Sequence, residues 1–365
     1  MSAQPLAPRY DPSRSYEWNF ENAPSPLSVA VPPFPGEQTF CGLPVASPLG
    51  IPAGPLLNGK WCLYYAGLGF DVLTYKTVRS SPRDCYPLPN LQPVDCGQLN
   101  GNETELPVGN TMHGTWAVSY GMPSMGPEFW QRDITATRDA LPADKLLSVS
   151  VVGSMQPGWT IDDLARDYAR CARWARDAGA DTVEANLSCP NVTSCDGQLY
   201  QHPRDAALVA AQLRDAIADT PLILKIGYLP DTALAKQLID AVAPYVQALA
   251  MTNSIATTVR TPAGKLLFEG QCRGICGDAI RQASVNQVAT LHTLIQQQGH
   301  PLEIIGVGGV QNGTHVEHYL TAGAHAVHMA TAPMMDPLVA IAIREHWSGA
   351  AHSDRHERPR NTDKR

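Results

Sequence analysis

Basic residues are not in excess in this sequence. Its 365 residues include 27 Lys and Arg against 34 Asp and Glu, which gives a formal net charge of −7. Proteins whose main partner is nucleic acid usually carry a basic face or stripe. We therefore expect no nucleic-acid partner, although a few lysines in a pocket would be enough to bind a small anionic molecule.

Long apolar runs are also missing. No segment approaches the roughly 18–20 uninterrupted apolar residues needed to span a bilayer. The N-terminal residues contain neither the apolar core of a secretory signal nor an amphipathic helical pair that could dock on a membrane. We therefore expect no membrane partner and a cytoplasmic location.

The cysteines form no recognisable framework. There are nine, at irregular spacing and without a Cys-x-x-Cys pair. An odd number without an export signal argues against structural disulfides. Cys272 and Cys276 alone are too few ligands for zinc or an iron–sulfur cluster. We expect no metal site.

The two ends of the chain differ in composition from its middle. Residues 1–45 are rich in proline and low in periodicity, which is typical of an extended arm lying over a folded body. Residues 350–365 are almost wholly polar and are expected to form a disordered tail. The body, residues 46–349, has a size within the range of a single barrel domain.

The body alternates short apolar segments with helical patterns. Eight segments are typical of buried strands: 47–54, 70–77, 146–153, 181–188, 221–228, 246–254, 303–309 and 324–330. Residues 160–179, 204–219 and 232–245 show the spacing of amphipathic helices. This alternation predicts a parallel α/β sheet, and eight units favour a closed (β/α)8 TIM barrel. An open doubly wound sheet is the alternative, but no G-x-G-x-x-G motif follows the first strand.

One long segment interrupts the alternation. Residues 80–130 are irregular and rich in Gly, Pro and Asn. Long insertions in a barrel follow the carboxyl ends of strands and shape the active site. We expect an irregular loop or β-hairpin insertion that helps to cover the carboxyl-terminal face.

Polar residues gather where the predicted strands end, which is the active-site face of a barrel. They are Lys76, Thr77, Asn186, Ser188, Cys189, Asn191, Lys225, Thr252, Asn253 and Ser254. After the seventh and eighth strands, Gly308–Gly309 and Ala330–Thr331 offer backbone amides that suit a phosphate group. Glycines at a strand end can also serve the turn alone.

Taken together, these segments resemble the dihydroorotate dehydrogenase family, especially its soluble branch. The resemblance covers about residues 45–345. It rests on NLSCPNV (186–192), YKT (75–77), SYGMPS (119–124), LKIG (224–227), TNS (252–254), GVGG (306–309) and HMAT (328–331), in the family's order. The soluble branch has a cysteine where the membrane-associated branch has a serine.

The resemblance implies an FMN-dependent oxidoreductase that oxidises dihydroorotate to orotate. The residues implied for FMN are Ala53, Gly54, Lys76, Thr77, Asn186, Lys225, Thr252, Ser254, Gly277, Gly308, Gly309, Ala330 and Thr331. Those implied for the substrate are Lys76, Tyr120, Gly121, Met122, Asn186, Asn191, Asn253 and Ser254.

The implied chemistry passes hydride to flavin N5 while a base takes the neighbouring proton. Cys189 is the implied base, with Lys76 and Ser188 in the same catalytic group. A thiol suits this role because its ordinary pKa of about 8.5 can be lowered by nearby lysines.

Three departures from the family bear on the substrate. Val118 stands where the family usually has an asparagine that contributes to orotate binding, Tyr120 replaces a smaller or more flexible side chain, and residues 95–117 form a longer loop. The alternative is an FMN barrel of the same family acting on another dihydropyrimidine, an enone or a secondary metabolite. A non-catalytic flavin-binding barrel is a further alternative, against which Cys189 and Lys225 argue.

The remaining partners are less constrained. We expect a soluble electron acceptor, of which fumarate fits best, with a separate electron-transfer chain as the alternative. The resemblance also implies a homodimer.

Overall fold

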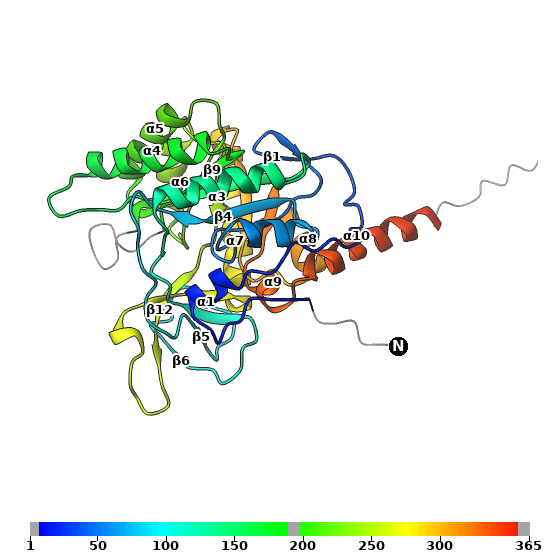
Figure 1. Ribbon diagram of the computed structural model, residues 1–365, viewed down its shortest axis with the longest axis horizontal. Helices are drawn as coiled ribbons and strands as arrows, with labels where there is room; N and C mark the ends of the chain where they lie inside the picture. The colour runs from blue at the N-terminus through cyan, green and yellow to red at the C-terminus, as the bar shows by residue number, and fades with distance from the viewer. Residues whose placement is uncertain (1–6, 189–197, 357–365) are drawn as a thin grey trace, which may run out of the picture.

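The computed structural model describes residues 7–188 and 198–356, with side chains described as far as Ser348. Its centre is a closed barrel in the order β3-β4-β8-β9-β10-β11-β14-β15 (Figure 1). The strands, each parallel to its neighbours, are β3 (Leu49–Ile51), β4 (Val72–Val78), β8 (Leu146–Val151), β9 (Thr182–Asn186), β10 (Leu222–Lys225), β11 (Ala248–Met251), β14 (Glu303–Val307) and β15 (Ala326–His328). The eight predicted strands and the TIM-barrel fold are confirmed.

Helices cover the outside of the barrel. They are α2 (Gly59–Ala66), α3 (Pro127–Ala140), α4 (Ile161–Asp177), α5 (Pro203–Ile217), α6 (Thr232–Val242), α7 (Arg281–Gln298), α8 (Gly313–Thr321), α9 (Thr331–Met335) and α10 (Val339–His356). The predicted helices correspond to α4, α5 and α6. The α4 helix begins after a capping box in which Thr160 and Asp163 each bond to the other's backbone amide.

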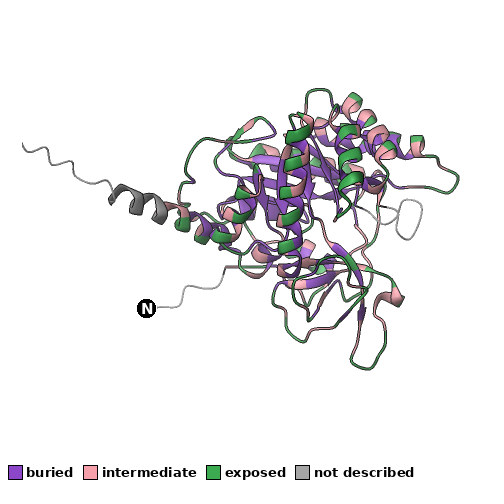
Figure 2. Cartoon of the chain, turned by 180° about the vertical axis from the view of Figure 1, so that it is seen from behind, coloured by how far each residue is buried: buried purple, intermediate pink, exposed green. Residues whose placement is uncertain are grey.

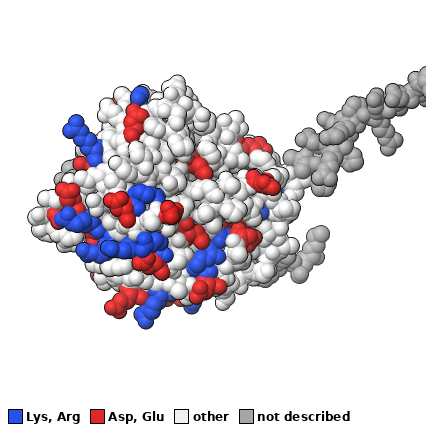
Figure 3. All heavy atoms as spheres, turned by 90° about the horizontal axis from the view of Figure 1, so that it is seen from above, with Lys and Arg blue, Asp and Glu red and all other residues white. Residues whose placement is uncertain are grey.

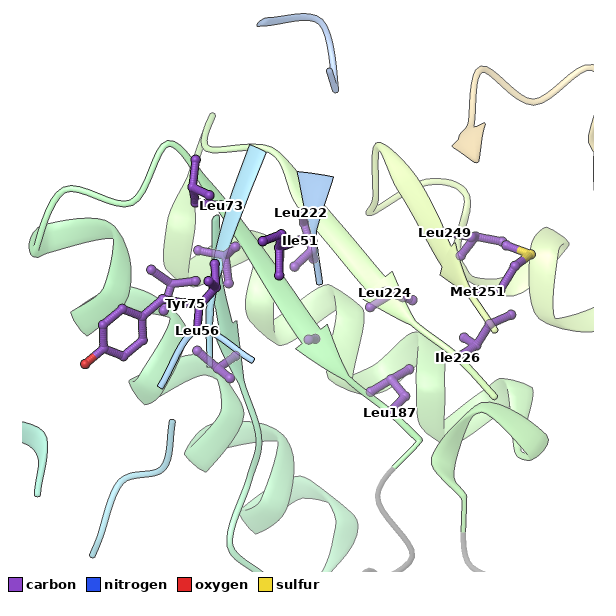
Figure 4. Close-up of a cluster of buried hydrophobic side chains, with 14 of the residues drawn as sticks. Ile51, Leu56, Leu73, Tyr75, Leu187, Leu222, Leu224, Ile226, Leu249 and Met251 are labelled. Atoms are coloured by element: carbon purple, nitrogen blue, oxygen red, sulfur yellow. The ribbon is translucent and has the colours of Figure 1, made fainter. Parts of the chain in front are cut away.

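The strand residues divide into two hydrophobic layers by alternation. Along β10, Leu222 and Leu224 join the large cluster shared with the helices, whereas Ile223 joins a smaller cluster inside the barrel. Figure 4 shows part of the outer layer, with side chains from β3, β4, β10 and β11. In Figure 2 the strands are buried and many outer helix residues are exposed. Burial on both faces explains why the strand sequences are nearly continuously apolar.

A β-hairpin closes the amino-terminal end of the barrel. It consists of β1 (Gln38–Phe40) and β2 (Leu43–Val45), and Phe40 stacks on His328 with ring centroids 5.5 Å apart. The Glu303 carboxylate accepts bonds from the amides of the hairpin turn. Burial lowers the pKa of His328 to about 3, so this ring is neutral. Only the carboxyl-terminal end is therefore left for a polar site.

The segment predicted as an extended arm contains regular elements. Besides this hairpin, residues 7–45 include α1 (Tyr16–Glu21), which begins at an N-cap where the Ser15 side chain accepts a bond from the Trp18 amide. These elements form because capping and pairing partners lie within the short segment, whereas residues 23–34 contain no helix or strand, as expected for an extended arm.

A second sheet lies beside the carboxyl-terminal face, below the barrel in Figure 1. Its order is β5-β7-β13-β12-β6, with β5 (Leu91–Pro93), β6 (Glu105–Pro107), β7 (Thr115–Val118), β12 (Ile255–Arg260) and β13 (Arg273–Gly277). Strands β5, β6 and β7 come from the predicted insertion at residues 80–130. The other two come from a segment after β11 that the sequence analysis did not identify as an insertion, and they convert the expected loop or hairpin into a five-stranded sheet.

The final helix continues into the segment that was predicted to be a disordered tail. The α10 helix extends to His356, whereas a disordered tail was expected from residue 350. Ala350 and Ala351 are good helix formers and explain the continuation. The rest of the predicted tail, residues 357–365, lies outside the described residues.

A buried ion cluster fastens α10 to the barrel. Arg344 is 2% exposed, donates to Pro32 O at 3.0 Å and pairs with Asp71, whose other carboxylate oxygen accepts from Lys145 Nζ at 2.5 Å. The cluster therefore joins α10, the N-terminal arm and the loop before β4. On the face in Figure 3, by contrast, the described basic and acidic side chains are interspersed at the surface.

Replacing Arg344 by leucine tests this cluster. We expect a loss of about 3 kcal/mol in the free energy of unfolding, because Asp71 keeps Lys145 but loses its buried guanidinium partner. Urea denaturation measures the change. The control, Arg166→Leu, removes an exposed ion pair with Asp163 and should cost less than about 1 kcal/mol. Equal losses would contradict the assignment.

Candidate active site

Lys76 lies near the end of β4 and is almost completely buried. Its side chain is 6% exposed, and its Nζ donates to Thr77 O at 3.2 Å and to Pro123 O. Burial, followed by the neighbouring Arg79 guanidinium, lowers the pKa of Lys76 to about 7, and Cys85 opposes this shift. No ion pair joins Lys76 to any described carboxylate. Its ammonium is therefore a cation that can accept an anionic guest.

The loop at 119–124 places free amides near this lysine. Gly121 and Met122 both have positive φ, +73° and +52°. Their flanks are held by hydrogen bonds such as Tyr86 N to Tyr120 O at 3.1 Å, but neither amide of the pair donates to another described residue. Pro123, the next residue of this loop, accepts a hydrogen bond from Lys76 Nζ. The Lys76 ammonium therefore lies at the same loop as the free amides of Gly121 and Met122. Such a set suits a carboxylate.

Asn186 joins the ends of β4 and β9. Its Nδ2 lies 3.4 Å from Thr77 Oγ1 and 3.5 Å from Met122 Sδ. Its Oδ1 accepts from the Ser188 hydroxyl at 2.7 Å and from the Ser188 amide. The structure thus brings Thr77, Met122, Asn186 and Ser188 together.

Two of the predicted site residues, Cys189 and Asn191, lie outside the described residues. Ser188, directly before Cys189, is 6% exposed and is held by Asn186.

Lys225, at the end of β10, is a second buried cation. It is 3% exposed, stands beside Asn186 in the strand register, and donates to Ala53 O at 3.2 Å. Like Lys76, it has no ion pair with a described carboxylate. Gly54, next to Ala53, has φ +148° and nothing within 4 Å of the place a Cβ would occupy. The position above the Gly54 Cα is therefore open.

Glycines line the site beyond β13 and β14. Gly277 has φ +96°, and a Cβ there would lie 1.7 Å from Gly114 O. A Cβ on Gly309 would lie 2.8 Å from Gly277 O, so these two backbones approach closely. Gly308 O accepts a bond from Tyr319 at 2.6 Å. The neighbouring strand β15 leads to Ala330 and Thr331. The cradle requires residues without side chains and fits a phosphate group.

The segment after β11 adds hydroxyl groups. Thr252 is fully buried, and its Oγ1 has no partner among the described residues. Asn253 donates its amide to Ile226 O at 3.1 Å. Ser254 packs against Gly274 of β13, where a Cβ would lie 2.3 Å from its hydroxyl. The orphaned Thr252 hydroxyl is a further group that a bound cofactor can satisfy.

Two tyrosines of the N-terminal arm also reach the site. Tyr10 and Tyr120 share a hydrogen bond of 2.6 Å between their hydroxyls, and the Lys76 ammonium lies 5.3 Å from the centroid of the Tyr16 ring. Sequence reasoning missed both arm residues, because no periodicity or motif marks them. Val118 lies in β7, paired with Gly274 of β13.

One cavity in the described part of the chain is separate from these residues. It measures about 570 Å³ and is open to solvent. Its lining comprises Arg9, Asp11, Pro12, Ser13, Leu88, Pro89, Leu91, Met112 and Met335. No predicted site residue lines it. The described residues also contain no group of three or more His, Cys, Asp or Glu side chains that could hold a metal ion.

Comparison with known proteins identifies the family. The family model of dihydroorotate dehydrogenase matches residues 36–347. A dihydroorotate dehydrogenase of Dictyostelium discoideum is 32% identical over 92% of this chain and 96% of its own length. The chain belongs to the dihydroorotate dehydrogenase family.

Two further relatives support the assignment. The catalytic subunit of the NAD(+)-type dihydroorotate dehydrogenase B of Desulforudis audaxviator is 27% identical over 83% of this chain and 88% of its own length. The crystal structure of the Eimeria tenella enzyme in complex with ferulenol has a TM-score of 0.72 at 17% identity and covers 94% of each chain. At that identity the likeness concerns the fold.

The family's enzymes use FMN, and the geometry of this chain fits it. The space over Gly54 suits the ring system, Lys225 lies at its border, and the glycine cradle suits the phosphate. Thr252 offers a buried hydroxyl that has no partner among the described residues. These groups are compatible with the ring and the phosphate of FMN.

Lys225→Met tests the cation beside Ala53. A lysine at the flavin ring stabilises negative charge on the reduced form, so its loss should make the FMN reduction potential about 30–60 mV more negative. Spectrophotometric titration against a reference dye measures the potential. Lys236→Met, which removes an exposed pair with Asp240 on α6, should leave it unchanged. A potential unaffected by Lys225→Met would place this lysine away from the ring.

Proposed function

We propose that this chain oxidises dihydroorotate to orotate with FMN as its cofactor. The observation that carries the proposal is the pair of buried lysines, Lys76 and Lys225, which have no carboxylate partner among the described residues. Dihydroorotate brings a carboxylate, and reduced flavin brings negative charge. Each lysine would therefore gain an anionic partner in the working enzyme.

The residues around Lys76 match the substrate. The Lys76 ammonium and the free backbone amides of Gly121 and Met122 would bind the carboxylate of dihydroorotate. Together they would supply three donors for charge-assisted hydrogen bonds. The amide of Asn186 would bind the polar edge of the ring, since Asn offers both a donor and an acceptor. Asn191, Asn253 and Ser254 complete the proposed substrate set.

The remaining predicted residues would hold the cofactor. Ala53, Gly54, Thr77 and Lys225 would border the ring, and the glycine cradle with Ala330 and Thr331 would bind the phosphate. Bound FMN supplies the two-electron acceptor of the reaction. The polypeptide orients the ring and keeps water away from the reacting carbons.

Cys189 would take the proton next to the carbonyl. Its predecessor Ser188 donates its hydroxyl to Asn186, which is one of the residues proposed to bind the ring. A lysine ammonium group close to a thiol favours the thiolate, which is the basic form. Lys76 and Ser188 would belong to the same catalytic group: Lys76 would bind the substrate carboxylate, and Ser188 directly precedes Cys189.

Val118 favours a second candidate. Its apolar side chain cannot make the hydrogen bond of the asparagine usual in the family, and it lies in β7 opposite Gly274. An FMN enzyme of the same family acting on another dihydropyrimidine, an enone or a secondary metabolite would need no amide there. Substrate reduction of the flavin distinguishes the two.

The partners remain proposals as well. We propose a soluble electron acceptor such as fumarate, a homodimer and a cytoplasmic location. No helix among the described residues is long and apolar enough to cross a bilayer.

Replacing Cys189 by alanine tests the base. We expect anaerobic flavin bleaching by dihydroorotate to slow at least about 100-fold, because general-base catalysis commonly contributes that much. Stopped-flow absorbance measures the rate, and orotate binding should persist. Cys272→Ala, which changes an exposed thiol, should bleach like the wild type. Unaltered bleaching in Cys189→Ala would refute the base role, and a wild-type flavin that stays oxidised would favour the other substrates.

The charge on Lys76 predicts a pH dependence of ligand binding. Below its pKa of about 7 the lysine is cationic and attracts the orotate carboxylate; above it the free lysine is neutral. Affinity should therefore fall as pH rises above 7, at most about tenfold per unit.

Titrating the flavin absorbance with orotate in a Cys189→Ala background measures this dependence without the thiol. A Lys76→Arg variant remains charged throughout and should show a flat profile. A decline of equal slope in that variant would assign the titration to another group.

A further inference from the structure

The N-terminal arm spans the active-site face. Arg9 donates to Met335 O of α9 at 2.9 Å. At the other end of the arm, the indole of Trp61 on α2 donates to Asn19 O at 3.0 Å. Between these anchors, Tyr10 and Tyr16 are 1% and 6% exposed. The arm is thus fastened on both sides of two buried tyrosines.

Tyr16 is tied to the substrate loop through the backbone and through its ring. Its amide donates to Asn90 Oδ1 at 3.2 Å, and Asn90 Nδ2 donates to Ser119 O at 3.1 Å. The Tyr16 ring meets the Tyr120 ring edge-on at 6.0 Å, and Tyr120 in turn bonds to Tyr10. The arm and the loop at 119–124 are therefore joined both by the hydrogen bonds of Asn90 and by the tyrosine contacts.

The face of the Tyr16 ring contacts a charge. Lys76 Nζ lies 5.3 Å from the ring centroid, within the range of a cation–π interaction. The Tyr16 hydroxyl, by contrast, is buried with no partner among the described residues. The contact between Tyr16 and Lys76 is therefore made by the aromatic ring and not by the hydroxyl.

We propose that Tyr16 is a positioning residue that holds the Lys76 ammonium for the substrate carboxylate, which makes the N-terminal arm a part of the substrate site. The inference rests on the proposed function, in which Lys76 binds that carboxylate. A desolvated cation–π contact is worth roughly tenfold in an equilibrium constant. Arg79 disfavours the charged lysine, Cys85 favours it, and burial disfavours it most. The π face of Tyr16 supplies part of the missing stabilisation.

The test compares two aromatic side chains of nearly equal shape in the FMN-loaded enzyme. Tyr16→Phe keeps the electron-rich ring and should bind orotate within about twofold of the wild type. Phenylalanine fluorinated at positions 3, 4 and 5, placed at residue 16, keeps the packing but removes electron density from the ring face. It should weaken orotate binding and raise the KM for dihydroorotate, roughly tenfold near pH 8, with kcat little changed.

The pH profile separates positioning from packing. Losing the π contact lowers the pKa of Lys76 further, so the loss of affinity should be large near pH 8 and small near pH 6. Phe20→Leu is the matched control, because the Phe20 ring lies 6.1 Å from the Tyr16 ring in the same helix and, among the described residues, forms no cation–π pair with Lys76. The change in orotate affinity that Phe20→Leu causes should be the same at pH 6 and at pH 8.

Two outcomes would overturn the proposal. One is a fluorinated variant that binds orotate like Tyr16→Phe at both pH values. The other is an equal loss at both, as expected for a packing defect. A wild-type enzyme that fails to bind orotate at all would instead refute the proposed function.

Discussion

The structure depends on two lysine ammonium groups that are buried without a carboxylate partner among the described residues. An unpaired buried cation is costly, and proteins normally neutralise it or pair it. Elsewhere in the fold, Arg344, Asp71 and Lys145 form a buried cluster in which the charges are paired. Lys76 and Lys225 both lie at the carboxyl-terminal end of the barrel strands, where no described carboxylate pairs with them. An anionic guest is the simplest source of the missing charge.

The surrounding architecture separates this site from solvent. The hairpin of β1 and β2 closes the opposite end of the barrel, so the polar residues at the strand ends face one opening. The sheet built from β5, β6, β7, β12 and β13 lies beside that opening, and the arm with α1 packs against Lys76. These covers come from three segments that are distant in the sequence: the arm, the insertion after β4 and the insertion after β11.

The barrel was predictable from sequence because its strands and helices give local signals, whereas the roles of the candidate site residues stay predictions that rest on strand ends and motifs. Buried parallel strands are continuous apolar runs, and a lysine such as Lys225 on such a strand has few structural explanations. The second sheet was missed because its strands are short and pair across more than a hundred residues, as Val118 does with Gly274. Tyr16 and Arg344 were missed for the same reason: their roles depend on Lys76 and Asp71, which lie far away in the sequence. Cys189 and Asn191, predicted from their motif, lie outside the described residues.

The most direct test of this account is a crystal structure of the FMN enzyme with orotate. The account predicts the orotate carboxylate within hydrogen-bond distance of Lys76 Nζ and of the Gly121 and Met122 amides, with the flavin ring over Gly54 and beside Lys225. An orotate bound away from Lys76, or a flavin ring that does not contact Lys225, would contradict the claim that these two buried cations define the site.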